Sequence, residues 1–231
     1  MVSQPSAQTP PLEAGDRLTR PEFHRRYANM SSLKKAELIE GVVYMPAALR
    51  FKSHGQPHGR IMGWLSLYEA TTPHVALGDN ATVQLDLDNE LQPDAVLLIQ
   101  PEAGGQATIS ADDYIVGPPE LVVEVAASSV SIDLYDKKRA YRRNGVREYL
   151  VWQVFDQTVS WFALESGDYQ LLAADAQGII RSRQFPGLWL AVDDLLAGRM
   201  LQVFSVLQRG LATAEHHPFV ESLKTAANAK K

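Results

Sequence analysis

The stretch Leu121-Val122-Val123-Glu124-Val125-Ala126 decides the fold of this chain. Its side chains are apolar at every position but one, which is typical of a strand buried on both faces of a sheet. A second run of the same kind, DAVLLI at residues 94–99, comes earlier in the chain. Both runs have the length of buried strands, and we expect them to be neighbouring central strands of a sheet.

The segments on either side of these two strands extend this prediction. Before them, the sequence predicts a helix from Arg20 to Tyr27, two short strands within 36–45 joined by a tight turn at Glu40-Gly41, a helix after Pro57, and a half-buried strand over 83–88. After them it predicts a helix over 133–144, a β-meander of strands at 148–154, 158–164 and 169–173, and C-terminal helices from Val192 onward, the last opening at Pro218.

The organisation that follows has three parts. We expect a flexible leader over 1–16, a central domain over 17–197 and a C-terminal helical extension over 198–231. The first residues lack the basic and apolar regions of a secretory signal, and no apolar stretch approaches the roughly 18 residues of a membrane span. We therefore expect a cytoplasmic protein with no membrane partner.

Composition limits the chemistry available. The 231 residues include 22 Lys and Arg, 27 Asp and Glu and no cysteine, for a net charge of -5. The absence of cysteine excludes disulfides, thiolate metal sites and a cysteine nucleophile. The acidic average argues against a surface that is coated everywhere by nucleic acid, because phosphate binding scales with the number of cations brought to the backbone.

Glu124 is the most informative residue, because it interrupts an otherwise apolar strand. Burying an ionised carboxylate costs on the order of several kcal/mol unless it is paired or metal-bound. One interpretation is a structural ion pair with a buried Lys or Arg. The other starts from Asp94 at the beginning of the neighbouring strand, since two carboxylates with oxygen ligands only suit a hard cation such as Mg²⁺ or Mn²⁺.

A basic segment follows the second strand. Residues 137–147 contain six cations, Lys137, Lys138, Arg139, Arg142, Arg143 and Arg147. Such a run is often a solvated helix face, and the alternative is a local phosphate-binding surface. Tyr141 follows Lys137 by four residues, so both lie on one face of the helix.

Six segments, taken together and in order, resemble the Uma-type restriction endonuclease family of the PD-(D/E)XK nuclease superfamily. The segments are ELIEG at 37–41, Pro57-His58, LQPD at 91–94, GPPELVVEV at 117–125, DLYDK at 133–137 with Tyr141, and GVREY at 145–149. The resemblance covers roughly residues 18–196.

The resemblance implies a restriction-endonuclease-like mixed sheet flanked by helices and a metal-dependent endonuclease that hydrolyses phosphodiester bonds of DNA. It implies that Asp94 and Glu124 hold Mg²⁺ or Mn²⁺, with the Val125 carbonyl as a further ligand. Ala126 occupies the usual place of the catalytic lysine, which points to Lys137 on the following helix. Glu37 matches the family's first acid. Glu40 stays open as its competitor.

Three further residues are expected to contact nucleic acid: His58, Lys138 and Arg142. A zinc site from His54 and His58 is disfavoured because Gly55, Pro57 and Gly59 break the helical register that it needs. We expect no organic cofactor. A homodimer is expected because cutting a duplex needs two sites.

Two alternatives to the enzyme stay open. The first is a nuclease-fold protein with weak or no catalysis that acts as a nucleic-acid-binding or protein-interaction module. The second is a structural dimer with a buried Glu–Lys pair.

Overall fold

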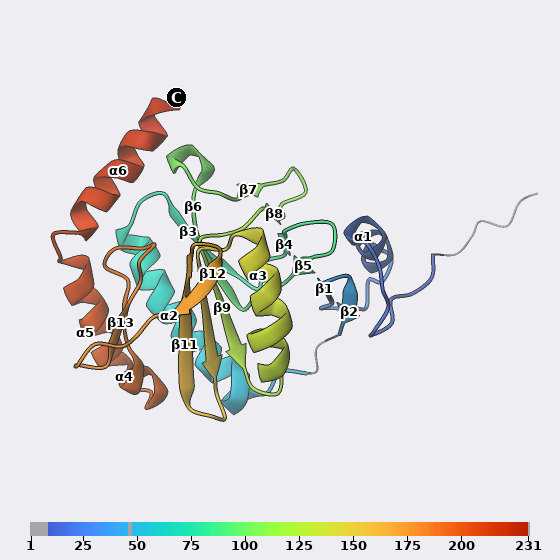
Figure 1. The fold of residues 1–231 in the computed structure, drawn as a ribbon, viewed down its shortest axis with the longest axis horizontal. Helices are drawn as coiled ribbons and strands as arrows, with labels where there is room; N and C mark the ends of the chain where they lie inside the picture. Colours follow the sequence, from blue (N-terminus) through green and yellow to red (C-terminus); the bar gives the residue numbers. More distant parts are fainter. Residues whose placement is uncertain (1–8, 46–47, 231) are drawn as a thin grey trace, which may run out of the picture.

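The central element is a six-stranded mixed sheet, seen in a computed structural model that describes residues 9–45 and 48–230 (Figure 1). Its strand order is β12-β11-β10-β9-β6-β3. The strands are β3 (Val75–Asp79), β6 (Ala95–Ile99), β9 (Leu121–Ala126), β10 (Glu148–Gln153), β11 (Thr158–Glu165) and β12 (Asp168–Leu171). Within this sheet, and among the described residues, β9 and β10 are the one parallel pair. The two apolar runs are neighbouring central strands, and the predicted mixed α/β fold is confirmed.

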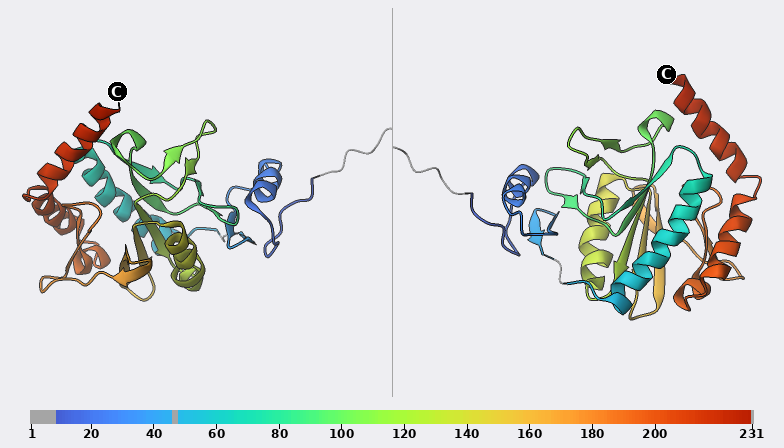
Figure 2. Two further views of the ribbon diagram at one scale, coloured as in Figure 1. Left: turned by 45° about the horizontal axis from the view of Figure 1, so that its top comes forward. Right: turned by 180° about the vertical axis from the view of Figure 1, so that it is seen from behind.

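Helices cover both faces of this sheet (Figure 2). On one face lies α2 (Gln56–Thr71), and on the other lie the π-helical turn η3 (Ile132–Lys137) and α3 (Lys138–Asn144). Side chains of β9 alternate between the two cores: Val123 and Val125 pack on the α2 side, whereas Val122 and Ala126 pack on the α3 side. Glu124 therefore faces η3 and α3.

The C-terminal helices extend the core on the α2 side. They are α4 (Val192–Leu196), α5 (Met200–Leu211) and α6 (His216–Ala229), beside the strand pair β13 (Ile179–Arg181) and β14 (Trp189–Ala191). Val203, Leu207 and Leu223 belong to the same buried cluster as Trp64 of α2. None of the helices in the described ranges is long and apolar enough to cross a membrane.

The N-terminal segments form part of a second region, and residues 20–44 lie on the opposite side of the molecule from α5 and α6 in Figure 1. This second region contains α1 (Arg20–Ala28) and a six-stranded sheet of order β2-β1-β5-β4-β8-β7. These strands are β1 (Glu37–Ile39), β2 (Val42–Tyr44), β4 (Val83–Gln84), β5 (Glu90–Leu91), β7 (Thr108–Ile109) and β8 (Ile115–Val116). The predicted turn between β1 and β2 is present, with positive φ at both Glu40 (51°) and Gly41 (75°).

The expected leader falls partly outside the described residues, which exclude residues 1–8. Within the described part, Leu12 is buried in a small core with Phe23, Leu38 and Val43. The amide of Gly15 donates to the Val43 carbonyl at 2.8 Å. Residues 12–15 therefore pack on the N-terminal region.

Three local predictions differ from the structure. The strand predicted over 83–88 ends at Gln84, because the Asp86 carboxylate accepts hydrogen bonds from the Asp88 amide and the Asn89 side chain and forms a turn. The helix predicted from Asp133 begins at Ile132 as a π turn, and the last helix begins at His216 rather than Pro218. Two short segments were not predicted as helices: η1 (Phe51–Gly55, π) and η2 (Pro101–Ala103, 3₁₀).

Candidate active site

A pocket of about 700 Å³ opens where β9 extends beyond its partner β6. Strand β6 pairs with β9 only at residues 121–123, so the last three residues of β9 have no neighbour on that side within β6. The pocket walls come from β1 and β2, η1, the end of β9, η3 and the β10–β11 turn. Its polar lining residues include Lys35, Glu37, Arg50, His54, Asp94, Glu124, Asp133 and Lys137.

Glu124 and Lys137 form the centre of the site. The Lys137 Nζ donates to Glu124 Oε1 at 2.9 Å, and the Tyr141 hydroxyl donates to the same oxygen at 3.0 Å. All three residues are buried. Lys137 and Tyr141 lie on the same face of the helix, as predicted, because residues four positions apart are neighbours on a helix surface.

Glu37 lies beside the Lys137 ammonium. Its Oε1 lies 3.0 Å from Lys137 Nζ and accepts the amide of Gln92 at 2.8 Å. Glu40 points elsewhere: its Oε2 lies 2.9 Å from an Arg143 nitrogen on α3. The geometry thus brings Glu37, and not its competitor Glu40, to the lysine.

Asp133 is a fourth acid that sequence reasoning did not assign to the site. It is 2% exposed, its Oδ1 lies 3.6 Å from Lys137 Nζ, and its Oδ2 accepts the Ser129 hydroxyl at 2.6 Å. The signal that could have found it is its position four residues before Lys137, on the same helical face.

Asp94 is held beside this cluster by two donors. His54 Nε2 donates to Asp94 Oδ1 at 3.0 Å, and the Val125 amide donates to Oδ2 at 2.7 Å. His58 Nε2 donates to the Asp94 backbone carbonyl at 3.0 Å. His54 was missed as an Asp94 partner, because the two residues are 40 positions apart and only the fold joins them.

The pKa values follow from this crowding. Burial raises the pKa of Glu124 from 4.5 to about 8, with Asp133, Asp94 and Glu37 adding repulsion and Lys137 opposing the shift. Burial also raises the pKa of Asp133. Burial would lower the pKa of Lys137, but its acidic neighbours hold it well above 10.5. The cluster thus places three acidic groups around one ammonium, and the raised pKa values of Glu124 and Asp133 show that ionising all three is unfavourable; a second cation would favour their ionised forms.

Asp94 behaves differently. Burial alone would raise the pKa of its carboxyl group, but the hydrogen bond from His54 and the amide of Val125 hold that pKa below 3.8. Asp94 is therefore ionised at neutral pH.

The expected nucleic-acid contacts are not gathered at the pocket. His58 touches Asp94, but Lys138 lies 3.6 Å above the ring of Phe162 and Arg142 donates to the Gly167 carbonyl at 2.9 Å. Both cations thus lie against β11 and the start of β12, outside the pocket lining.

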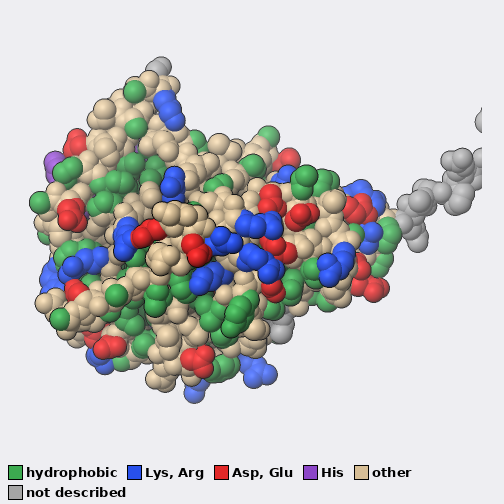
Figure 3. Space-filling model, in the orientation of Figure 1, with side chains coloured by type: hydrophobic (Ala, Val, Ile, Leu, Met, Phe, Trp, Pro, Cys, Tyr) green, Lys and Arg blue, Asp and Glu red, His purple; other side chains and the backbone are tan. Residues whose placement is uncertain are grey.

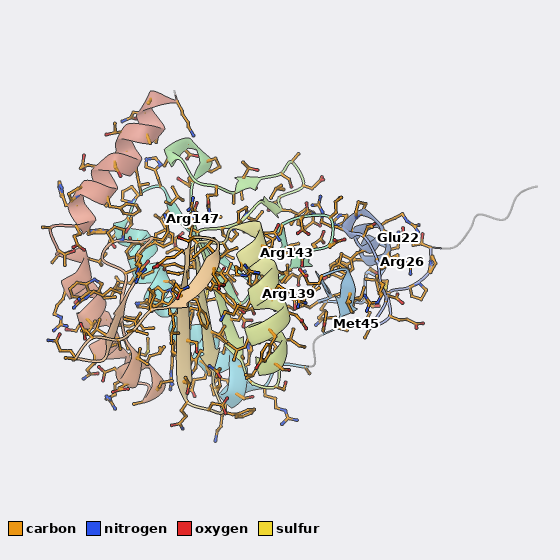
Figure 4. The ribbon with its side chains drawn as sticks, viewed as in Figure 1. Glu22, Arg26, Met45, Arg139, Arg143 and Arg147 are labelled. Atoms are coloured by element: carbon orange, nitrogen blue, oxygen red, sulfur yellow. The ribbon has the colours of Figure 1, made fainter. Side chains whose placement is uncertain are left out.

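The other arginines of this segment alternate with acids. Arg139 and Arg143 lie along α3 with Arg147 beyond its end (Figure 4). Glu40 lies within 4 Å of both Arg139 and Arg143, and Asp86 lies 3.4 Å from Arg143. Positive and negative side chains are interspersed across this face of the molecule (Figure 3). The exposed basic face is therefore largely internally paired.

The donor set suits a hard cation by its chemistry, since Asp94, Glu37, Glu124 and Asp133 supply only oxygen. In the described ranges, however, no group of three or more His, Asp or Glu side chains is arranged around one metal position. The reason is visible in the contacts: three of the acids converge on the Lys137 ammonium. Both hydrogen bonds to Glu124 use Oε1, so Oε2 is the atom through which this residue would reach a metal.

Comparisons with known proteins concern the family and the fold of the chain. A crystal structure of a putative nuclease belonging to DUF820 from Anabaena variabilis ATCC 29413 is similar with a TM-score of 0.56 and 12% identity, over 75% of this chain and 96% of that one. At this identity the likeness shows the fold alone. No curated protein matches the chain. Residues 20–193 match the profile of the Uma2 family, described as "Putative restriction endonuclease". Since this match spans most of the chain, the protein belongs to the Uma2 family, and its membership supports a nuclease that acts on nucleic acid.

Proposed function

We propose that this protein is a metal-dependent endonuclease that hydrolyses phosphodiester bonds of DNA. The observation that carries the proposal is the position of Lys137, whose ammonium lies 2.9 Å from Glu124 and 3.0 Å from Glu37 in the wall of a pocket that Asp94 also lines. A lysine beside paired acids at an open strand end is the arrangement that phosphodiester chemistry needs, because charge develops on the phosphate as the bond breaks.

In this proposal Asp94 and Glu124 hold Mg²⁺ or Mn²⁺. The chemistry that such an ion supplies when bound is polarisation of the phosphate and a lowered pKa of water. Asp94 is presented in the ionised form by His54 and the Val125 amide. Tyr141 fixes the rotamer of Glu124.

Lys137 has the remaining role. Its ammonium is a compact charge with three donors, and its raised pKa keeps it protonated at neutral pH. It therefore orients an attacking water or stabilises the negative charge that forms on the phosphate. Glu37 holds the ammonium in place from β1.

Cleavage assays test the enzyme. Wild type, Asp94→Asn, Lys137→Met and the surface control Glu102→Gln are incubated with single-stranded, duplex and branched DNA in Mg²⁺, Mn²⁺ or EDTA. We expect cleavage by wild type and the control, at least about 100-fold less by the two site variants, and none in EDTA. Cleavage by Asp94→Asn at the wild-type rate would contradict the proposal.

Calorimetry tests the metal site independently of activity. Magnesium or manganese is titrated into wild type, Glu124→Gln and Glu102→Gln. We expect binding in wild type and the control and a loss of at least about tenfold in affinity for Glu124→Gln. Equal affinity in all three would remove Glu124 from the site.

A second candidate function is a nucleic-acid-binding module without catalysis. The observation that favours weak or absent catalysis is that, in the described ranges, no three His, Asp or Glu side chains are arranged around one metal position. DNA binding by wild type without cleavage in either metal would support this candidate.

We also propose a homodimer for cleavage of a duplex, because two cuts, one in each strand, need two copies of the carboxylate pocket. Light scattering during size-exclusion chromatography measures the mass directly. A mass of 25.5 kDa, that of one chain, both with and without DNA, would contradict the dimer.

A further inference from the structure

The pocket is much larger than its carboxylate cluster requires. At roughly 30 Å³ per water, about 700 Å³ has room for some 20 waters, far more than one cation and its ligands occupy. Its volume lies in the range of small-molecule pockets, roughly 300–1,000 Å³. The site therefore has space for a group the size of a nucleoside beside the acids.

The lining around the acids is apolar and partly aromatic. Ile39, Tyr44, Ile132 and Phe155 contribute to it. Phe155 is 69% exposed even though it borders the pocket, so its ring is available as a flat apolar surface. An exposed aromatic ring at the mouth of a polar site is a feature of proteins that stack unpaired bases.

The backbone places this ring at the same end of the sheet as Glu124. The Val154 amide donates to the Ala126 carbonyl at 2.9 Å, which extends the β9–β10 pairing to the residue before Phe155. Glu124 and Ala126 lie on the same face of β9, toward η3. A strand whose phosphate is at the carboxylates thus has Phe155 within reach of an adjacent base.

Charge is arranged for a nucleotide as well. Lys35 and the exposed Arg50 line the pocket, so positive side chains border the acidic cluster. Cations at a rim attract the phosphates of a strand, whereas the acids below favour a bound cation.

We propose that this pocket takes an unpaired nucleotide, with its base stacked on Phe155, and that the substrate is therefore single-stranded DNA. The inference rests on the proposed nuclease function, because it assumes a phosphate at the carboxylate cluster. A base inside a duplex already stacks on its neighbours and cannot offer a face to Phe155.

Binding measurements test the pocket. Fluorescence anisotropy compares a labelled single strand, the same strand with one abasic position, and its duplex, in Ca²⁺, which takes the same oxygen ligands as Mg²⁺. We expect wild type to bind the single strand at least about tenfold more tightly than the duplex. We expect Phe155→Ala to lose about 5- to 100-fold for the single strand, and Phe155→Trp to retain affinity with quenched tryptophan fluorescence on binding.

Tyr135→Ala is the matched control, because Tyr135 is 72% exposed but does not line the pocket. Equal losses of affinity for the single strand in Tyr135→Ala and Phe155→Ala would overturn base stacking in the pocket and indicate a general surface effect. Tighter binding of the duplex, unaffected by Phe155→Ala, would overturn the single-strand substrate. If wild type cut duplex DNA faster than single-stranded DNA, and Phe155→Ala cut both at the wild-type rates, this inference would fail while the proposed nuclease stands. No cleavage of any DNA by wild type would remove the nuclease instead.

Discussion

At the scale of single residues, the site depends on how a buried carboxylate is compensated. Glu124 interrupts the apolar strand 121–126, so its importance can be predicted from sequence. Its partner Lys137 follows from the resemblance to a family, whereas Asp133 and His54 do not. Their roles arise from contacts at Lys137 and Asp94 that only the folded chain creates.

The hydroxyl of Tyr141 stabilises this cluster. Tyr141→Phe keeps the packing of the ring on Tyr149 but removes the 3.0 Å hydrogen bond to Glu124. We expect the free energy of unfolding to fall by about 1–3 kcal/mol, as measured by urea denaturation. Tyr135→Phe, which removes the hydroxyl of a tyrosine that is 72% exposed, is the control and should change it by less than about 0.5 kcal/mol. Equal effects of the two substitutions would contradict a special role for Tyr141.

The raised pKa of Glu124 predicts a pH dependence of stability without metal. The folded chain holds a proton on this group up to about pH 8, whereas an unfolded chain releases it near 4.5. The unfolded state therefore binds fewer protons between these values, and stability falls as the pH rises from 4.5 to 8, by on the order of a few kcal/mol. Glu124→Gln should lack this contribution. We therefore expect the free energy of unfolding of the variant to rise relative to that of wild type from pH 5 to 6.5 to 8, as measured by urea denaturation in EDTA. A constant difference between the two free energies would refute the shift.

At the scale of elements, long periodic segments were predictable and irregular ones were not. The strands β6, β9 and β10 and the helix α2 follow directly from apolar patterns. The π turn η3 has the composition of an ordinary helix, and the two-residue strands β5, β7 and β8 are too short to show a period. Yet η3 carries Asp133 and Lys137, so the part of the site that was hardest to predict lies on an irregular element.

Close packing at Gly210 tests how α5 meets the strand pair β13–β14. A Cβ at this position would overlap the Gly187 carbonyl oxygen and lie 2.8 Å from the Trp189 ring. We expect Gly210→Ala to lower the melting temperature, with a loss of at least about 1–3 kcal/mol from overpacking. Gly59→Ala in α2 is the control, since nothing lies within 4 Å of its added methyl group, and should stabilise by about 0.5–1 kcal/mol. A gain for both substitutions would show that α5 is not packed closely there.

At the scale of the whole molecule, the net charge does not reveal the site, whereas the buried core shows how the C-terminal helices join the central sheet. The net charge of -5 gives no indication of the Lys137 cluster, because charges of both signs are interspersed over the face seen in Figure 3 and the site itself is acidic. The division of the chain at residue 197 stays a prediction. The buried cluster that contains Trp64 continues into α5 and α6 without interruption, which favours one cooperative unit.

Substitutions at two leucines of α5 test whether the shared core stabilises the C-terminal helices and the central sheet together. Leu207 is fully buried against the α2 side of the core, and Leu201 in the same helix is 80% exposed. If the C-terminal helices fold as one unit with the central sheet, Leu207→Ala should lower the free energy of unfolding by about 2–5 kcal/mol in a single transition, because it leaves a cavity in the shared core. Leu201→Ala makes the same chemical change at the surface and should alter it by less than about 0.5 kcal/mol. The unfolding transition of Leu207→Ala should occur at the same denaturant concentration whether it is followed by tryptophan fluorescence or by circular dichroism. Two separate transitions, with the fluorescence transition at its wild-type position, would instead show that the C-terminal helices unfold independently of the sheet that carries the site.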